Sequence, residues 1–228
     1  MTHLFWHSSP GARALLLAAA LLLNGAQAAL ADESFDRQLL DIQNRWAEAN
    51  YRADGRTQKQ AFDALLEDAR AFESAHPDRA EARVWHGIVA SSYAGVKGPF
   101  GALALAKEAR AALEAAEGLD PSVLDGSVYT SLGALYYKVP GGMIGFGDRD
   151  KARDYLQKAL EANPAGMDPN YFYAEFMFEQ DEYDAAREAL LRARNAPPRP
   201  ARPLADQGRR IEVDALLEKV NAKLGREG

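Results

Sequence analysis

Residues 128–164 read VYTSLGALYYKVPGGMIGFGDRDKARDYLQKALEANP, and this stretch decides the fold. Its apolar residues follow two helical periods separated by a glycine-rich break. Small residues at Gly133 and Ala152 predict a close helix crossing, because larger side chains would push the two axes apart. The stretch therefore predicts a helix hairpin that ends at Pro164 and needs a second hairpin to bury its narrow apolar face. The apolar positions are Tyr129, Leu132, Gly133 and Tyr136 in the first helix, then Ala152, Leu156 and Ala159 in the second.

Two other stretches repeat this spacing. In residues 80–121, Gly87 takes the small position of the first helix, and a set of second-helix residues matches Ala152, Leu156, Ala159 and Pro164; this set is Ala109, Leu113, Ala116 and Pro121. In residues 168–198 the first helix carries Tyr173, Ala174 and Met177, and the second carries Ala186, Leu190, Ala193 and Pro198. Recurrence of one register predicts a stack of similar hairpins.

These residues, from Tyr129 through Pro164, resemble a tetratricopeptide repeat, whose period is about 34 residues. Glycine-rich insertions interrupt two of the copies, at residues 91–105 and between Tyr136 and Ala152. Interrupted repeats in an exported chain are similar to the T-component family of TRAP-type solute transporters. The first resemblance implies an all-α, short solenoid of stacked antiparallel hairpins. The second implies a cavity or pore that handles a hydrophobic solute.

The N-terminus has the pattern of a signal peptide over residues 1–28. Arg13 precedes an apolar run over residues 14–23, and Ala26, Gln27 and Ala28 form a small-x-small cleavage pattern. Cleavage after Ala28 or Ala31 predicts a periplasmic protein with no stable membrane span; an uncleaved membrane anchor or a buried helix is the alternative. The chain has no cysteine, so it forms no disulfide and carries no lipid on a cysteine, whereas T-component proteins are typically lipoproteins.

We expect the remaining chain, residues 32–228, to be a single helical-repeat domain. Asp120 and Asp168 each precede a proline, which predicts carboxylates that cap helices. Residues 197–210, PPRPARPLADQGRR, predict an extended segment, and the residues from Ile211 to Leu224 have the apolar pattern of a closing helix. The expected units are a degenerate repeat over 35–77, repeats over about 80–121, 126–164 and 168–198, and a capping helix over 205–224.

Composition and motifs argue against several functions. The formal charge is −6 with no basic run, which disfavours nucleic acid and anionic membrane surfaces. The run GGMIGFGD has the glycine spacing of a phosphate loop, but Asp148 and Arg149 stand where lysine and serine or threonine belong. His76 and His86 lack spaced partners for a metal. We therefore expect a non-enzymatic protein without catalytic residues, cofactor or metal.

The first helices of such a stack line its concave side. Counting along the register places aromatic residues around one carboxylate and one lysine there, a combination suited to a peptide or a small amphipathic ligand. The predicted groove residues are Tyr137, Lys138, Tyr171, Glu175 and Phe178, with Val84, Ile88 and Ser91 from the earlier repeat. Each of these rings could instead pack between helices.

The insertions hold apolar residues where loops are ordinarily polar, notably Phe100, Met143, Ile144 and Phe146. They either cover the helices, form a contact surface or line a cavity. The sequence thus predicts a periplasmic binding protein for a protein partner or a small hydrophobic solute, with a TRAP-like accessory role implied by the resemblance. The alternative is an envelope assembly scaffold that binds proteins without a small ligand.

Overall fold

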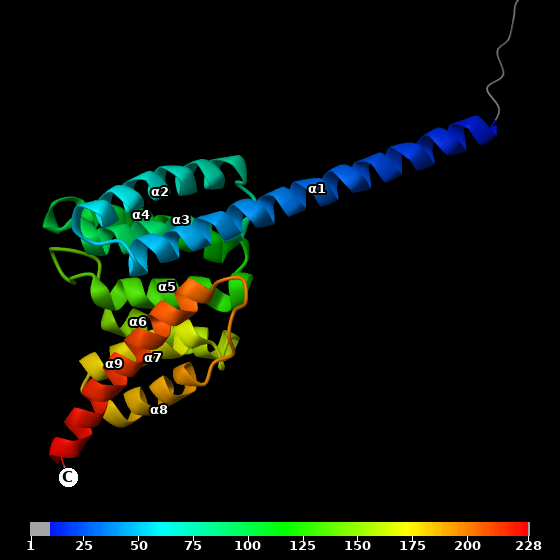
Figure 1. Ribbon diagram of the computed structural model, residues 1–228. Helices are drawn as coiled ribbons and strands as arrows, with labels where there is room; N and C mark the ends of the chain where they lie inside the picture. The colour runs from blue at the N-terminus through cyan, green and yellow to red at the C-terminus, as the bar shows by residue number, and fades with distance from the viewer. Residues whose placement is uncertain (1–9, 228) are drawn as a thin grey trace, which may run out of the picture. The chain divides into compact units, whose positions relative to one another are not determined.

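The structure, a computed structural model, describes residues 10–227, with side chains described for residues 31–225 other than Pro99. Regular structure within these residues is entirely helical, which confirms the predicted all-α fold (Figure 1). The helices are α1 (Pro10–Tyr51), α2 (Gly55–Ala75), α3 (Ala80–Lys97), α4 (Pro99–Leu119), α5 (Val123–Lys138), α6 (Arg149–Ala162), α7 (Met167–Glu179), α8 (Tyr183–Arg194) and α9 (Pro203–Glu227).

The chain divides into two compact units, residues 1–39 and 40–228. In the first unit, the described residues form one continuous helical segment, the N-terminal part of α1. The predicted signal peptide, residues 1–28, lies outside the residues with described side chains and stays a prediction. Among residues 31–225, no helix combines the length and the apolar character needed to cross a bilayer.

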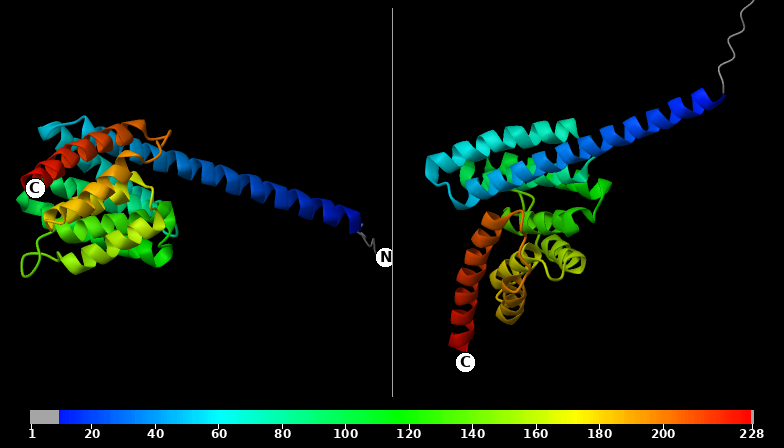
Figure 2. Two further views of the ribbon diagram at one scale, coloured as in Figure 1. Left: turned by 90° about the horizontal axis from the view of Figure 1, so that it is seen from below. Right: turned by 45° about the vertical axis from the view of Figure 1, so that its right-hand side comes forward.

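The second unit is a stack of helix hairpins. Helix α3 packs on α4, α5 on α6, and α7 on α8, while α2 packs on α3 and α9 packs on α7 and α8. The first helices of consecutive hairpins also touch, α3 with α5 and α5 with α7, whereas α4 and α6, like α6 and α8, make no such contact in the described chain. First helices therefore lie on the inner side of a curved stack, as in a helical solenoid (Figure 2).

A glycine sets the helix crossing in two of the hairpins. A Cβ atom on Gly133 would lie 2.7 Å from Cγ of Leu156, and one on Gly87 would lie 2.6 Å from Cγ of Leu113. In the third hairpin the corresponding residue is Ala174, which is fully buried. The prediction that small residues allow close packing at Gly133 and Gly87 is confirmed.

The second helices bury the predicted stripe completely. All nine of its residues have 0% exposure, and they are Ala109, Leu113, Ala116, Ala152, Leu156, Ala159, Ala186, Leu190 and Ala193. Burying each leucine side chain contributes about 1.5–3 kcal/mol, so this shared stripe supplies a large part of the driving force for stacking.

The two predicted capping carboxylates do not cap helices. Gly166 occupies the N-cap of α7, and Asp168 lies in the first turn with its carboxylate bound to arginine side chains. Asp120 follows α4 and accepts hydrogen bonds from the backbone N–H and the hydroxyl of Ser122, at 2.8 and 2.7 Å. The regular part of α5 starts later, because residues 124–126 have left-handed backbone conformations.

The closing helix is longer than its apolar pattern indicated. Helix α9 begins at Pro203, so only the part of residues 197–210 before it is irregular. Proline suits this start because its missing N–H has no helical partner there. Ile211 is 64% exposed, although the pattern placed it on the apolar face, whereas Val213 and Val220 are fully buried.

Candidate ligand cavity

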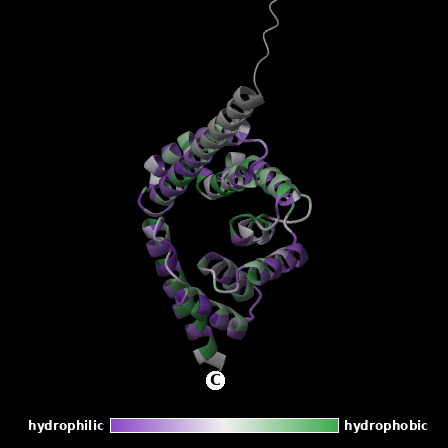
Figure 3. Cartoon of the chain, turned by 90° about the vertical axis from the view of Figure 1, so that its right-hand side faces the viewer, coloured by the Kyte–Doolittle hydropathy of each residue, from purple (hydrophilic) through white to green (hydrophobic). Residues whose placement is uncertain are grey.

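The inner side of the second unit holds a cavity of about 1140 Å³ that is open to solvent. Its walls come from the end of α1, from α3, α4 and α5, from the start of α7, and from residues 197–202 with the start of α9. In Figure 3 the backbone of the second unit is seen as a ring of helices, coloured by hydropathy. The lining residues are predominantly apolar, and they include Trp46, Trp85, Ile88, Leu103, Leu135, Val139, Ile144 and Phe172.

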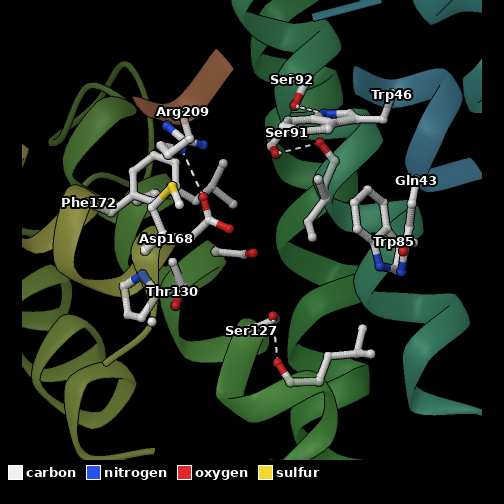
Figure 4. A pocket seen from close by; sticks show the side chains of 18 of the residues that line it. Gln43, Trp46, Trp85, Ser91, Ser92, Ser127, Thr130, Asp168, Phe172 and Arg209 are labelled. Carbon is white, nitrogen blue, oxygen red and sulfur yellow. Dashed lines mark hydrogen bonds and ion pairs between the residues drawn. The ribbon is translucent and has the colours of Figure 1, made fainter. Parts of the chain in front are cut away.

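Two tryptophans form one wall of the cavity. Figure 4 shows Trp46 and Trp85 with Gln43 on one side, facing Asp168, Phe172 and Arg209 on the other. The two indole rings meet edge to face, with centroids 5.9 Å apart. The Trp46 indole N–H donates to the hydroxyl of Ser92 at 2.8 Å. Since aromatic pairs hold large apolar area rigidly, this wall suits an apolar ligand.

An ion-pair cluster forms the opposite wall. The Asp168 carboxylate accepts from Arg199 at 2.6 Å and from Arg209 at 2.8 Å, and Arg199 also binds Asp206 at 2.6 Å. Burial opposes ionisation of Asp168, but Arg209 and Arg199 outweigh it and hold the pKa of this carboxyl well below its usual range. The cluster ties α9 and the segment before it to the start of α7.

Arg202 lies between these two walls. Its guanidinium carbon is 4.8 Å from the centroid of the Trp85 ring, a cation–π distance. Burial, followed by the neighbouring charge of Arg199, lowers the pKa of the Arg202 guanidinium to about 10. The surroundings therefore disfavour the cation at this place.

The floor of the cavity includes a strained turn. Leu124 and Asp125 have φ angles of 51° and 55°, in the left-handed region that non-glycine residues rarely occupy. The Ser127 hydroxyl donates to the carbonyl of Leu124 at 2.7 Å and holds this turn. Strained backbone at a cavity wall is typical of functional sites.

Three of the five predicted groove residues meet. The Tyr137 hydroxyl donates to the Glu175 carboxylate at 2.5 Å, and the Lys138 ammonium lies 2.7 Å from it. Burial, together with the Glu175 charge, raises the pKa of Tyr137 well above its usual range. Of the five, Lys138 alone lines the cavity. Tyr137 packs against Phe176, with ring centroids 5.5 Å apart.

The other two groove residues lie elsewhere. Tyr171 is buried, and the Arg209 guanidinium stacks 4.4 Å from its ring centroid. Phe178 contacts Tyr183 of α8, with ring centroids 5.7 Å apart, so it belongs to a helix–helix contact. From the earlier repeat, Ile88 and Ser91 line the cavity, whereas Val84 is fully buried and is not part of the lining.

One of the four predicted insertion residues packs against the helices, and the other three are exposed. Phe146 folds back onto Tyr136, with ring centroids 5.8 Å apart, and under the guanidinium of Arg110. Phe100 is 94% exposed, and Met143 is fully exposed. Ile144 is 73% exposed and lies at the edge of the cavity.

The glycine run between α5 and α6 is a tight turn. The Gly147 N–H donates to the carbonyl of Pro140 at 3.0 Å, and the Asp148 N–H donates to that of Tyr136 at 2.9 Å. The Asp148 side chain caps α6 by accepting from two backbone N–H groups. These donors close the turn, so they do not face an anion as they would in a phosphate loop.

The histidines serve helix packing. His86 is buried between Glu73 and Glu108, and its Nε2 lies 2.8 Å from the latter carboxylate. Those carboxylates also bind Arg83 and Arg70. His76 ends α2, with its ring 4.9 Å from that of Phe72.

Sequence reasoning missed Trp46, Trp85 and the three arginines Arg199, Arg202 and Arg209 as cavity residues. The arginines lie in and just after a proline-rich segment that also leads into an apolar helix. The sequence offered one signal for these cavity residues, namely a cluster of cationic side chains next to the predicted closing helix. These arginines reach α7 only because the chain reverses its direction after α8, and no local sequence pattern encodes that reversal.

A match to one family model agrees with the repeat geometry. Residues 143–205 match the family described as "Tetratricopeptide repeat". The solved structure described as "Crystal structure of MamA" is similar to the chain with a TM-score of 0.42 and 20% sequence identity, over 74% of this chain and 92% of that one. No curated protein sequence matches the chain.

Stacked repeats of this family create concave surfaces that serve protein–protein interaction. Residues 143–205 cover α7 and α8 completely, together with most of the turn before α6, all of α6 and the start of α9. Residues 143–205 are therefore similar to a tetratricopeptide repeat.

Proposed function

We propose that this protein is a non-enzymatic binding protein that holds a small, largely apolar solute in the cavity of its second unit. The cavity itself carries the proposal: its volume of about 1140 Å³ is slightly above the usual range for ligand pockets, roughly 300–1,000 Å³. Aromatic walls with a few polar groups are the usual lining of such pockets.

Three of the five hydroxyl groups of the lining are held in hydrogen bonds that support binding more than catalysis. Ser91 and Ser127 donate to backbone carbonyls, at 2.9 and 2.7 Å, and Ser92 accepts from Trp46. A nucleophile needs a general base within hydrogen-bond reach, and these hydroxyls are committed to the structure. The buried His86 is not among the lining residues.

We also propose the compartment in which this protein acts and the transport system to which it belongs. The signal-peptide pattern of residues 1–28 supports a periplasmic protein. A solute cavity inside interrupted helical repeats supports an accessory role in TRAP-like uptake. We expect a neighbouring gene to encode a periplasmic solute receptor. We also expect cells that lack this protein to lose uptake of the solute that this receptor binds. Normal uptake of that solute in the deletion strain would remove this part of the proposal.

A cavity-filling variant tests the binding proposal. Ala134 lines the cavity from α5, and tryptophan there would occupy the ligand volume. We expect wild-type protein to bind the neutral fluorescent probe N-phenyl-1-naphthylamine with one site per chain, and Ala134→Trp to lose most of this binding. The matched control is Ala111→Trp on the exposed face of α4, which should bind as wild type does. Equal binding by both variants would place the probe outside the cavity.

A second candidate function is a scaffold that binds another envelope protein. The exposed side chains of Phe100, Met143 and Ile144 favour it, since large apolar side chains on loop tips are contact points for partners. Cross-linking in cells should then yield a partner adduct that disappears with Met143→Ser and Ile144→Ser together. Retention of the adduct in this double variant would exclude the loop as the contact.

A further inference from the structure

The cations of the cavity wall are paired, with one exception among the described residues. Arg199 and Arg209 share Asp168, and Lys138 binds Glu175. Arg209 also binds Glu212 at 2.7 Å. Arg202 lines the same cavity and forms no ion pair with a described carboxylate. It is thus the cation of this wall that is left to interact with a ligand.

Two donors at Arg202 and Trp85 lack acceptors. The Nε atom of Arg202 and the Nε1 atom of Trp85 are both buried, and neither has a hydrogen-bond partner within the described chain. The two side chains are stacked, and both line the cavity. Buried N–H donors are nearly always satisfied in folded proteins, so these two donors leave hydrogen-bonding capacity unused beside the cavity.

Electrostatics favour an anionic acceptor. A buried cation without a partner is unfavourable, and an opposite charge within hydrogen-bond reach offsets that cost. The nearest carboxylates, Asp168 and Asp206, are held by Arg199 and Arg209. A guanidinium binds a carboxylate through two parallel N–H···O bonds, which also fixes the orientation of the ligand.

We propose that Arg202, stacked on Trp85, is the anchor for the carboxylate of an amphipathic ligand whose apolar part lies along the tryptophan wall. This inference rests on the proposed function, because it names the chemical class of the solute that the cavity takes. The ligand class is a monocarboxylate with an aliphatic chain or ring system. The polar anchor and the apolar wall select against purely apolar molecules and against small hydrophilic anions.

The test compares an anion with its neutral counterpart. Calorimetric titration of full-length protein with decanoate and with decanol, each below its aggregation limit, should give tighter binding of decanoate. Arg202→Gln should weaken decanoate binding by about tenfold to a hundredfold, the effect of losing a hydrogen bond between charged groups. It should leave decanol binding unchanged, and Arg202→Lys should restore part of the decanoate affinity. Arg56→Gln, on an exposed position of α2, is the matched control.

The outcomes separate the two proposals. If wild-type protein binds both ligands equally, or if Arg202→Gln weakens both equally, the anchor is wrong while the solute cavity stands. If wild-type protein binds neither ligand, and does not bind N-phenyl-1-naphthylamine, the proposed function fails and the anchor fails with it. The comparison of decanoate with decanol on wild-type protein needs no variant, so it can contradict the inference even if Arg202→Gln fails to fold.

Discussion

Gly133 shows how a single missing side chain sets the distance between two helices. A Cβ atom there would lie 2.7 Å from Cγ and 3.2 Å from the backbone nitrogen of Leu156. We predict that Gly133→Ala lowers the free energy of unfolding by about 1–3 kcal/mol, because the helices must separate to admit the methyl group. Gly133→Leu should cost more. Urea denaturation followed by circular dichroism measures both.

Gly118 provides the control for this prediction. It lies exposed on α4, and a Cβ atom there would meet nothing within 4 Å. Gly118→Ala should leave stability unchanged or raise it by at most about 1 kcal/mol, since alanine loses less backbone entropy on folding. Equal effects of alanine at both positions would show that Gly133 does not limit the helix approach.

Asp168 is the residue on which the α9 cluster depends. Its side chain is 29% exposed and that of Arg209 is 8% exposed. Asp168→Asn would leave buried arginine charges without their counter-ion. We predict a loss of about 2–3 kcal/mol at neutral pH, less than the 3–5 kcal/mol of a fully buried pair, because Asp168 keeps some access to water.

The pH dependence of this effect has a definite sign. The pKa of Asp168 is lowered in the folded protein, so its contribution is complete above the unfolded value of about 3.9 and is lost as the pH falls toward the lower folded pKa. The stability difference between wild type and Asp168→Asn should therefore be constant from neutral pH to about pH 5 and shrink below pH 4. A difference that grows on acidification would contradict the ion-pair assignment.

At the scale of elements, α9 closes the cavity by packing against the end of α1 within the second unit. A Cβ atom on Gly208 would lie 2.4 Å from the Tyr51 ring, and the Tyr51 hydroxyl is 3.3 Å from Glu212 of α9. We predict that Gly208→Ala displaces the start of α9, lowers stability by about 1–3 kcal/mol and weakens probe binding. Hydrogen exchange should accelerate in residues 203–212.

Gly225 lies on the same helix and is the matched control. It is exposed, and a Cβ atom there would meet nothing within 4 Å. Gly225→Ala should preserve both probe binding and hydrogen exchange. Unchanged exchange in Gly208→Ala would show that α9 tolerates the methyl group and that close approach to Tyr51 is not required.

The same scale separates what the sequence could and could not predict. The hairpins followed from Gly133 and Leu156, because contacts between neighbouring helices repeat with a local period. The expected capping helix, residues 205–224, begins within two residues of the observed start of α9 at Pro203, whereas the apolar pattern alone began only at Ile211 because proline and arginine at residues 197–202 obscured the helical pattern. Asp168 was misread as a cap because local sequence shows a favourable capping position but not a distant arginine that competes for the carboxylate.

At the scale of the whole molecule, the sequence predicted which helices face the concave side, but it did not predict which distant residues complete the cavity there. Stacked hairpins place their first helices inward, and Ile88, Ser91 and Lys138 of these helices line the cavity. Trp85 and Arg202 meet only because α9 returns toward α1, over a sequence separation that periodicity does not cover. The cavity is therefore a property of the closed stack and belongs to no single repeat.

The central claim is that this closed stack carries a small molecule. Native mass spectrometry of the protein purified from its own cells, under conditions that keep bound ligands, tests it most directly. We predict one small amphipathic molecule per chain in wild-type protein, its loss from Ala134→Trp, and its retention in Ala111→Trp. A bare chain, or a bound protein with no small molecule, would contradict the claim; the latter would favour the scaffold function.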